Sequence, residues 1–75
     1  MATVRHLEHI QLQVEARHTN ADATWSIIID RDGDRYLQID TYGSSERKLV
    51  GKKSQSVRIA VEAIEELKDI LARYF

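Results

Sequence analysis

The stretch TWSIIIDRDGDRYLQIDTY, residues 24–42, restricts the possible folds of this chain more than any other sequence feature. Two runs rich in β-branched and aromatic residues, 24–30 and 35–41, flank the dipeptide Asp32-Gly33. Asp-Gly suits the positive φ angles of a two-residue type I′ turn, and the flanking runs have the composition of strands. The stretch therefore predicts a β-hairpin.

A two-residue turn at Asp32-Gly33 also predicts which side chains share a face of the hairpin. It places Ile29 opposite Tyr36 and Trp25 opposite Asp40. One face then carries Trp25, Tyr36 and Tyr42, and the other carries Ile28, Leu37 and Ile39. Both faces include apolar groups, so both need to be covered.

Three further segments complete the predicted architecture. Ile10, Leu12 and Val14 alternate with polar residues, which predicts a half-buried strand over residues 7–16. A short strand is predicted at 55–59 and an amphipathic helix at 61–74, the helix covering one face of the sheet. The apolar stripe of this helix consists of Val61, Ile64, Leu67, Leu71 and Tyr74.

Chain length and the absence of cysteine bear on how such a fold is stabilised. With 75 residues the chain forms one domain, 1–75, whose core is small, and without cysteine no disulfide supports it. Self-association is the expected source of further apolar burial. The amino terminus does not resemble a signal sequence, and no apolar run approaches the roughly 20 residues of a membrane span. We expect the protein to remain in the compartment where it is made.

The charges are unevenly distributed along a chain whose formal net charge is -1. Residues 1–40 carry four cations and seven acids, residues 41–60 five cations and one acid, and residues 61–75 two cations and four acids. A local cationic segment attracts polyanions even on a slightly acidic protein, because electrostatic steering acts over about 8 Å at physiological salt. The cations of this basic segment are Arg47, Lys48, Lys52, Lys53 and Arg58.

Several other patterns do not predict a catalytic or metal site. The three aspartates of DRDGD have calcium-like spacing, but the glycine and glutamate of a calcium loop are not at the required positions, so they are interpreted as turn residues. GKKS lacks the earlier glycine of a phosphate-binding loop. His6 and His9 would point to opposite faces of a strand. We find no nucleophile paired with a base, and expect neither catalysis nor a metal or cofactor.

Aromatic residues near the basic segment favour a nucleic-acid ligand. Cations neutralise phosphates, and exposed rings stack on unpaired bases at about 1 to 3 kcal/mol each. Tyr42 lies beside the segment, and Trp25 and Tyr36 are the other candidate rings. Two alternatives remain: the rings are core residues, or the basic segment is a solvated loop.

The sequence also resembles the single-stranded-DNA-binding domain of the transcriptional coactivator positive cofactor four and its bacterial and phage relatives. The resemblance covers residues 25–75 and rests on YLQIDTY, a polar basic loop, GKKSQSV and a terminal amphipathic helix. It implies a homodimer whose curved sheets form channels for single-stranded DNA and whose helices help to pair the protomers. Tyr42 matches the family's strand, and Lys52 and Lys53 match its Gly-basic-basic element. Asp40 departs from the family, which commonly has arginine there.

Together these observations predict an α+β fold, with a curved four-stranded antiparallel sheet followed by one C-terminal amphipathic helix in the order β-β-β-β-α. The expected function is binding of single-stranded or unwound DNA with little sequence preference, as a homodimer, in transcription, replication or recombination. The cell compartment would be the cytoplasm of a bacterial or phage-infected cell, or the nucleus of a eukaryote, and transcription or replication proteins are further candidate partners. The alternative is a protein-binding adaptor that uses the aromatic face. The candidate nucleic-acid-binding residues are Trp25, Arg35, Tyr36, Tyr42, Arg47, Lys48, Lys52, Lys53 and Arg58, and the candidate dimer-interface residues are Leu67, Leu71 and Tyr74.

Overall fold

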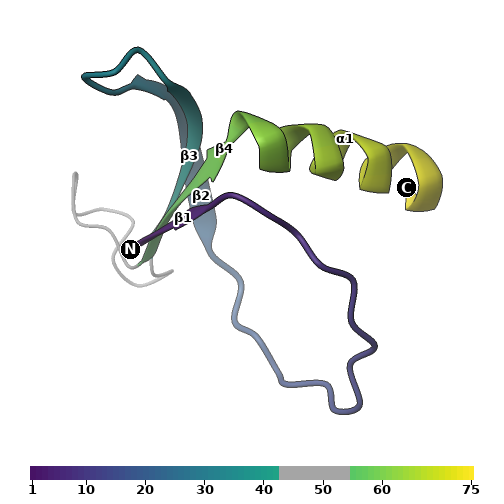
Figure 1. Cartoon of the computed structure of the whole chain (residues 1–75). Coiled ribbons are helices and arrows are strands. Elements are labelled where there is room, and N and C mark those ends of the chain that lie inside the picture. The colour runs from purple at the N-terminus through teal and green to yellow at the C-terminus, as the bar shows by residue number, and fades with distance from the viewer. Residues whose placement is uncertain (43–54) are drawn as a thin grey trace.

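The computed structural model describes residues 1–42 and 55–75 and has four strands followed by one helix (Figure 1). The elements are β1 (Ala2–Val4), β2 (Asp22–Ile29), β3 (Arg35–Tyr42), β4 (Gln55–Ala60) and α1 (Val61–Tyr74). The predicted α+β fold with the order β-β-β-β-α is confirmed. Four candidate residues of the basic segment, Arg47, Lys48, Lys52 and Lys53, lie outside the described residues.

The four strands form one mixed sheet in the order β1-β4-β3-β2. β2 and β4 both pair antiparallel with β3, whereas β1 runs parallel to β4. The prediction of an entirely antiparallel sheet was therefore wrong for its first strand. The first strand is also not the predicted segment 7–16 but Ala2–Val4, in which Thr3 pairs with Arg58 and Val4 with Ile59. Thr3 and Val4 are β-branched and therefore suit a strand.

The alternating segment 7–16, predicted as a strand, is irregular in the structure. Ile10, Leu12 and Val14 are exposed. Alternation shows that a segment is compatible with a strand, but it does not supply a partner edge. The beginning of this segment is held at the helix instead, where the backbone N–H of Leu7 donates to Glu66 Oε1 at 2.7 Å and His6 Nδ1 lies 3.0 Å from Glu66 Oε2.

The predicted hairpin is present, but its turn has three residues rather than two. The N–H of Asp30 donates to the carbonyl of Asp34 at 3.0 Å, and the N–H of Gly33 donates to the carbonyl of Asp30 at 3.1 Å. Gly33, with φ of 84°, is the only residue with positive φ in the described ranges, whereas a type I′ turn needs two. The extra turn residue shifts the register by one, so Ile28 faces Tyr36 and Trp25 faces Ile39.

This shift moves the side chains of β2 to the opposite face from the one predicted, because strand side chains alternate. The structure has one apolar and one polar face, with β2, β3 and β4 in register across both. The apolar face consists of Ala2, Val4, Trp25, Ile27, Ile29, Leu37, Ile39, Val57 and Ile59, with Ala23, Thr41 and Gln55 at one end and Arg35 at the hairpin end. The polar face consists of Thr3, Asp22, Thr24, Ser26, Tyr36, Gln38, Asp40, Tyr42, Ser56 and Arg58, with Ile28 and Ala60 at the hairpin end.

Helix α1 contacts β3 and β4 but leaves Trp25, Ile27 and Ile29 of β2 exposed, so the prediction that it covers a whole face of the sheet was wrong. It follows β4 directly and runs away from the sheet in Figure 1, and Ala63 is its one buried residue. The helix is stabilised locally by Glu62 in its first turn and Arg73 in its last turn, which complement the helix dipole. Arg73 also pairs with Asp69 at 3.2 Å. No helix in the described ranges has the length and apolarity that crossing a membrane requires.

Candidate nucleic-acid interface

The centre of the polar face is a network of four hydrogen-bonded side chains on β3 and β4. Arg58 lies opposite Gln38, and Ser56 lies opposite Asp40. Arg58 Nε donates to Gln38 Oε1 at 2.7 Å, and Gln38 Nε2 donates to the two Asp40 carboxylate oxygens at 3.2 and 3.1 Å. Ser56 Oγ donates to Asp40 Oδ1 at 2.6 Å. Gln38 and Asp40 are only 8% and 4% exposed and lie beneath the surface, whereas Ser56 and Arg58 are half-buried.

Tyr42 occupies the end of the polar face nearest the basic segment. It is half-buried, and its hydroxyl lies 3.1 Å from Thr24 Oγ1 on the neighbouring strand. β3 ends at Tyr42 and β4 begins at Gln55, and Thr41 pairs with Gln55 in the sheet. Both ends of segment 43–54 are therefore attached beside Tyr42.

Tyr36, by contrast, is not available as a stacking platform. Its residue surface is 6% exposed, and its hydroxyl donates to Asp30 Oδ2 at 3.0 Å while accepting from Arg5 Nη2 at 3.1 Å. The ring is a packed part of the polar face beside the hairpin turn. The prediction that Tyr36 stacks on bases is corrected, because a base cannot reach a ring that neighbouring groups cover.

Arg5 and Asp30, the two hydrogen-bond partners of the Tyr36 hydroxyl, both have shifted pKa values. The hydrogen bond to Tyr36 raises the pKa of the Arg5 guanidinium, with a smaller contribution from Glu62, whose Oε2 lies 3.6 Å away. The backbone N–H of Asp34 lowers the pKa of Asp30, and the Tyr36 hydroxyl and the N–H of Asp32 act in the same direction. Asp30 is therefore an ionised acceptor at neutral pH.

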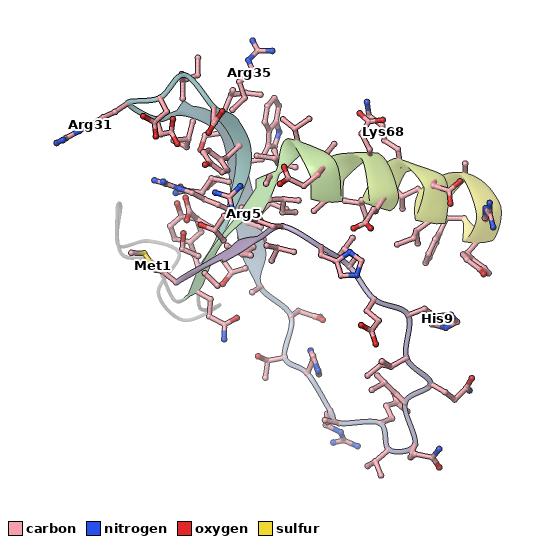
Figure 2. All side chains as sticks on the ribbon, viewed as in Figure 1. Met1, Arg5, His9, Arg31, Arg35 and Lys68 are labelled. Carbon is pink, nitrogen blue, oxygen red and sulfur yellow. The ribbon has the colours of Figure 1, made fainter. Side chains whose placement is uncertain are left out.

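Trp25 lies on the apolar face, opposite Ile39, and is 71% exposed. The prediction that it shares a face with Tyr36 and Tyr42 was wrong, because the register differs by one residue. Arg35, at the start of β3, lies on the same face as Trp25 and is exposed. Figure 2 shows Arg35 and Arg31 pointing away from each other near the hairpin turn.

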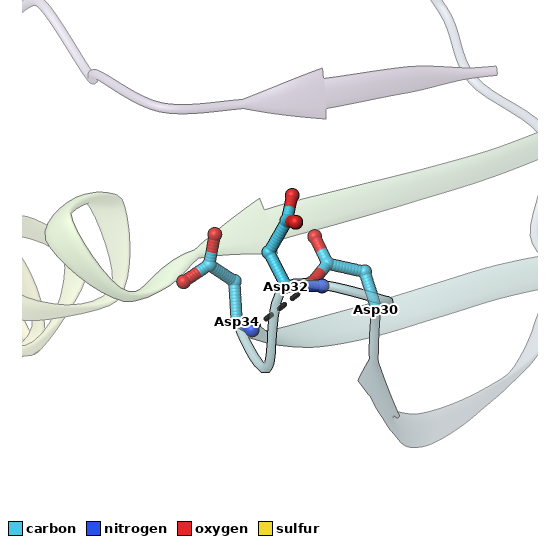
Figure 3. A group of neighbouring side chains, drawn as sticks. All are labelled: Asp30, Asp32 and Asp34. Carbon is cyan, nitrogen blue, oxygen red and sulfur yellow. Dashed lines mark hydrogen bonds between the residues drawn. The ribbon is translucent and has the colours of Figure 1, made fainter.

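Asp30, Asp32 and Asp34, the acids predicted to be turn residues, form a cluster at the hairpin turn (Figure 3). Their carboxylate oxygens come within 4.8 Å of one another. Asp30 Oδ1 accepts from the backbone N–H groups of Asp32 and Asp34 at 2.9 and 3.0 Å, which fixes the turn. The spacing of the three acids is explained by this turn structure.

The candidate dimer residues lie on the helix away from the sheet. Leu67 is half-buried, whereas Leu71 and Tyr74 are 48% and 68% exposed. Tyr74 also lines an open groove between the end of the helix and the amino-terminal segment, with Leu7, Ile10, Leu12, Ile70 and Phe75. The described residues therefore cover the apolar stripe of the helix only in part, and Val61, Leu71 and Tyr74 remain exposed.

Sequence reasoning missed the roles of Gln38, Asp40 and Ser56. A signal was present, because YLQID and QSVRI alternate polar and apolar residues with a period of two. Such alternation places the polar members of each strand on one face. Their mutual contacts depend on how β3 and β4 are aligned. The two strands are separated in the sequence by segment 43–54, so the pattern of either strand alone does not give this alignment.

Comparison of this chain with family models, with curated proteins and with solved structures gives no match.

Proposed function

We propose that this protein binds single-stranded or unwound DNA with little sequence preference, and that it does so as a homodimer. In this proposal the polar face binds the nucleic acid and the apolar face binds a second copy of the chain. The observation that carries the proposal is the separation of the two faces. Arg58 and Tyr42 lie on the polar face, and the ends of the basic segment are attached at its edge.

The polar face supports binding of a single strand in particular. Tyr42 offers a half-exposed ring at the end of β3, and Arg58 offers a guanidinium three residue pairs along the sheet from the Thr41–Gln55 pair. A ring beside cations suits unpaired bases and phosphates together, whereas a duplex has no free base to stack on. The remaining cations of the segment, Lys52 and Lys53 among them, would add phosphate contacts without sequence readout.

The apolar face supports binding of a second copy. A compact monomer of 8.7 kDa exposes about 4,700 Å² by the usual scaling with mass, whereas this chain exposes 6896 Å². The difference is about 2,000 Å², shared between the exposed segment 8–21 and the open apolar face, and an obligate homodimer interface buries about that much or more over both protomers together. Trp25, Ile27 and Ile29 contribute exposed apolar surface to this face, and Leu71 and Tyr74 contribute more on the helix.

Such binding would serve transcription, replication or recombination, in a bacterial or phage-infected cytoplasm or in a nucleus. Transcription or replication proteins would be its further partners. No catalytic step is part of this proposal.

Fluorescence anisotropy with labelled single-stranded and duplex oligonucleotides, each across a salt series, tests the proposal. We expect the single strand to bind more tightly, with log K falling linearly as log salt rises. Equal affinity for the duplex, or affinity that does not respond to salt, would refute it.

A protein-binding adaptor is the second candidate function, and the exposed apolar face around Trp25 favours it. It predicts a chain that remains monomeric in sedimentation at micromolar concentration and does not bind single-stranded DNA. The two candidates are thus separated by the same two measurements.

A further inference from the structure

Asp40 is an unexpected residue on a face that binds DNA, because a carboxylate repels phosphate. The structure shows that this carboxylate is not presented to solvent, since Asp40 is 4% exposed. A buried carboxylate is tolerated only when hydrogen-bond donors surround it. Asp40 accepts from Gln38 and Ser56, so its position has a structural explanation.

The charge of Asp40 determines the orientation of the neighbouring Gln38 amide. An amide side chain has a donor end and an acceptor end, whereas an ionised carboxylate only accepts. Gln38 must therefore turn Nε2 toward Asp40, where it donates at 3.1 and 3.2 Å, and its Oε1 toward Arg58. The reverse orientation would place an oxygen against the carboxylate and N–H groups against the N–H of Arg58.

The oriented amide in turn fixes Arg58. Gln38 Oε1 accepts from Arg58 Nε at 2.7 Å, which holds the plane of the guanidinium through its inner nitrogen. The two terminal nitrogens have no acceptor within residues 1–42 and 55–75, and the side chain borders an open pocket that is also lined by Met1, Ala2, Thr3 and Ser56. A guanidinium held by Nε, with its terminal N–H groups available, is suited to a phosphate.

We propose that Asp40 and Gln38 are positioning residues that hold the Arg58 guanidinium ready to bind a phosphodiester group of the nucleic-acid backbone. The inference rests on the proposed function, because it names the phosphate-binding group of that same face. Asp40 would thus support anion binding indirectly, although its own negative charge repels a phosphate.

The test uses the full chain and the substitutions Gln38→Met, Asp40→Asn and Arg58→Ala. Gln38→Met keeps the length of the side chain and removes its hydrogen bonds, and Asp40→Asn keeps the shape and removes the charge that orients the amide. Gln11→Met makes the same chemical change as Gln38→Met at an exposed position outside the sheet, so it serves as the matched control. Thermal unfolding confirms that each variant is folded.

The first measurement is the NMR signal of the Arg58 Nε–H group, identified by its loss in Arg58→Ala. We expect a signal protected from solvent exchange in the parent protein and in Gln11→Met, and loss of that protection in Gln38→Met. This readout reports the side-chain geometry and does not depend on any ligand.

The second measurement is affinity for a single-stranded oligonucleotide. Loss of a pre-organised side chain predicts roughly three- to tenfold weaker binding for Gln38→Met and Asp40→Asn. Gln38→Met should have no further effect when Arg58 is already alanine. If Gln38→Met weakens binding equally in both backgrounds, or leaves affinity at the parent level, the positioning role is refuted while DNA binding stands. A parent protein that does not bind single-stranded DNA refutes the proposed function and this inference together.

Discussion

Replacing Trp25 by threonine tests whether the apolar face is a protein interface. Trp25 is 71% exposed, and full burial of a tryptophan removes up to about 250 Å² from water, so an interface here would bury roughly 180 Å² more. At about 25 cal/mol per Å² this corresponds to about 4 kcal/mol per protomer. A threonine would bury part of that surface, and association recovers only part of the area energy. We expect dimer dissociation to become at least about a hundredfold easier.

Two assays measure this effect. Sedimentation across a concentration series gives the dissociation constant of the parent and of Trp25→Thr. Trp25 is also the one tryptophan of the chain, so its emission reports on this face alone. In the parent we expect emission at shorter wavelength where the dimer forms, with a shift to longer wavelength on dilution.

Threonine is a suitable replacement because it retains strand propensity, so a folding defect is not expected. Ser26→Thr, on the other face of the same strand, should leave the dissociation constant unchanged. If the parent protein sediments as a monomer, with the emission of a solvated indole at every concentration, the apolar face is not an interface between copies of the chain. A dimer unaffected by Trp25→Thr would place the interface elsewhere.

Three further predictions concern the binding face, the basic segment and the hairpin turn. Tyr42→Ala should weaken single-stranded DNA binding by roughly 1 to 3 kcal/mol and leave weak duplex binding nearly unchanged, as measured by anisotropy; normal binding with a lower Tm would make Tyr42 a packing residue instead. Joint replacement of Lys52 and Lys53 by alanine should reduce the salt slope by up to about 0.7 per lost phosphate contact, with Lys68→Ala on the exposed helix surface as control. Because the pKa of Asp30 is lowered from its ordinary value of 3.8, its stabilising contribution is complete above that pH and is lost as the pH falls toward the lower, folded value. Acid unfolding monitored by circular dichroism should therefore lack this step in Asp30→Asn, and an unchanged acid profile would contradict it.

The hairpin illustrates which parts of the fold could be predicted from sequence. Predicted strands at 24–30 and 35–41 correspond closely to β2 and β3, because β-branched composition is a local property. The predicted turn length was wrong. Gly33 provides a positive φ, which both a two-residue and a three-residue turn require, so its presence does not distinguish the two turns. The side chain of Asp30, bonded to two backbone N–H groups, stabilises the longer turn. The one-residue difference in turn length changed the face on which Trp25 lies.

The candidate site was predictable to a similar extent. Arg58 could be identified as a cation of the basic segment and Tyr42 from its place beside that segment's cations, and both lie on the polar face. Gln38 and Asp40 could not be assigned a role, because a buried acid is recognisable only once its hydrogen-bond partners on the adjacent strand are known. The helix at 61–74 was predicted correctly, but its covering role was not, since amphipathicity does not say which surface the apolar stripe meets.

The parallel pairing of β1 with β4 has a consequence for the order in which the chain folds. Ala2 pairs with Val57 and Val4 with Ile59, so the first of the four described strands to be synthesised pairs with the last of them. The β2–β3 hairpin is local and can form while synthesis continues, whereas closing the long loop between β1 and β4 must wait for the C-terminal part of the chain. We therefore expect β1 to dock last, onto an edge of β4 that stays open until then, and the newly made chain to expose that edge to other strands in the meantime.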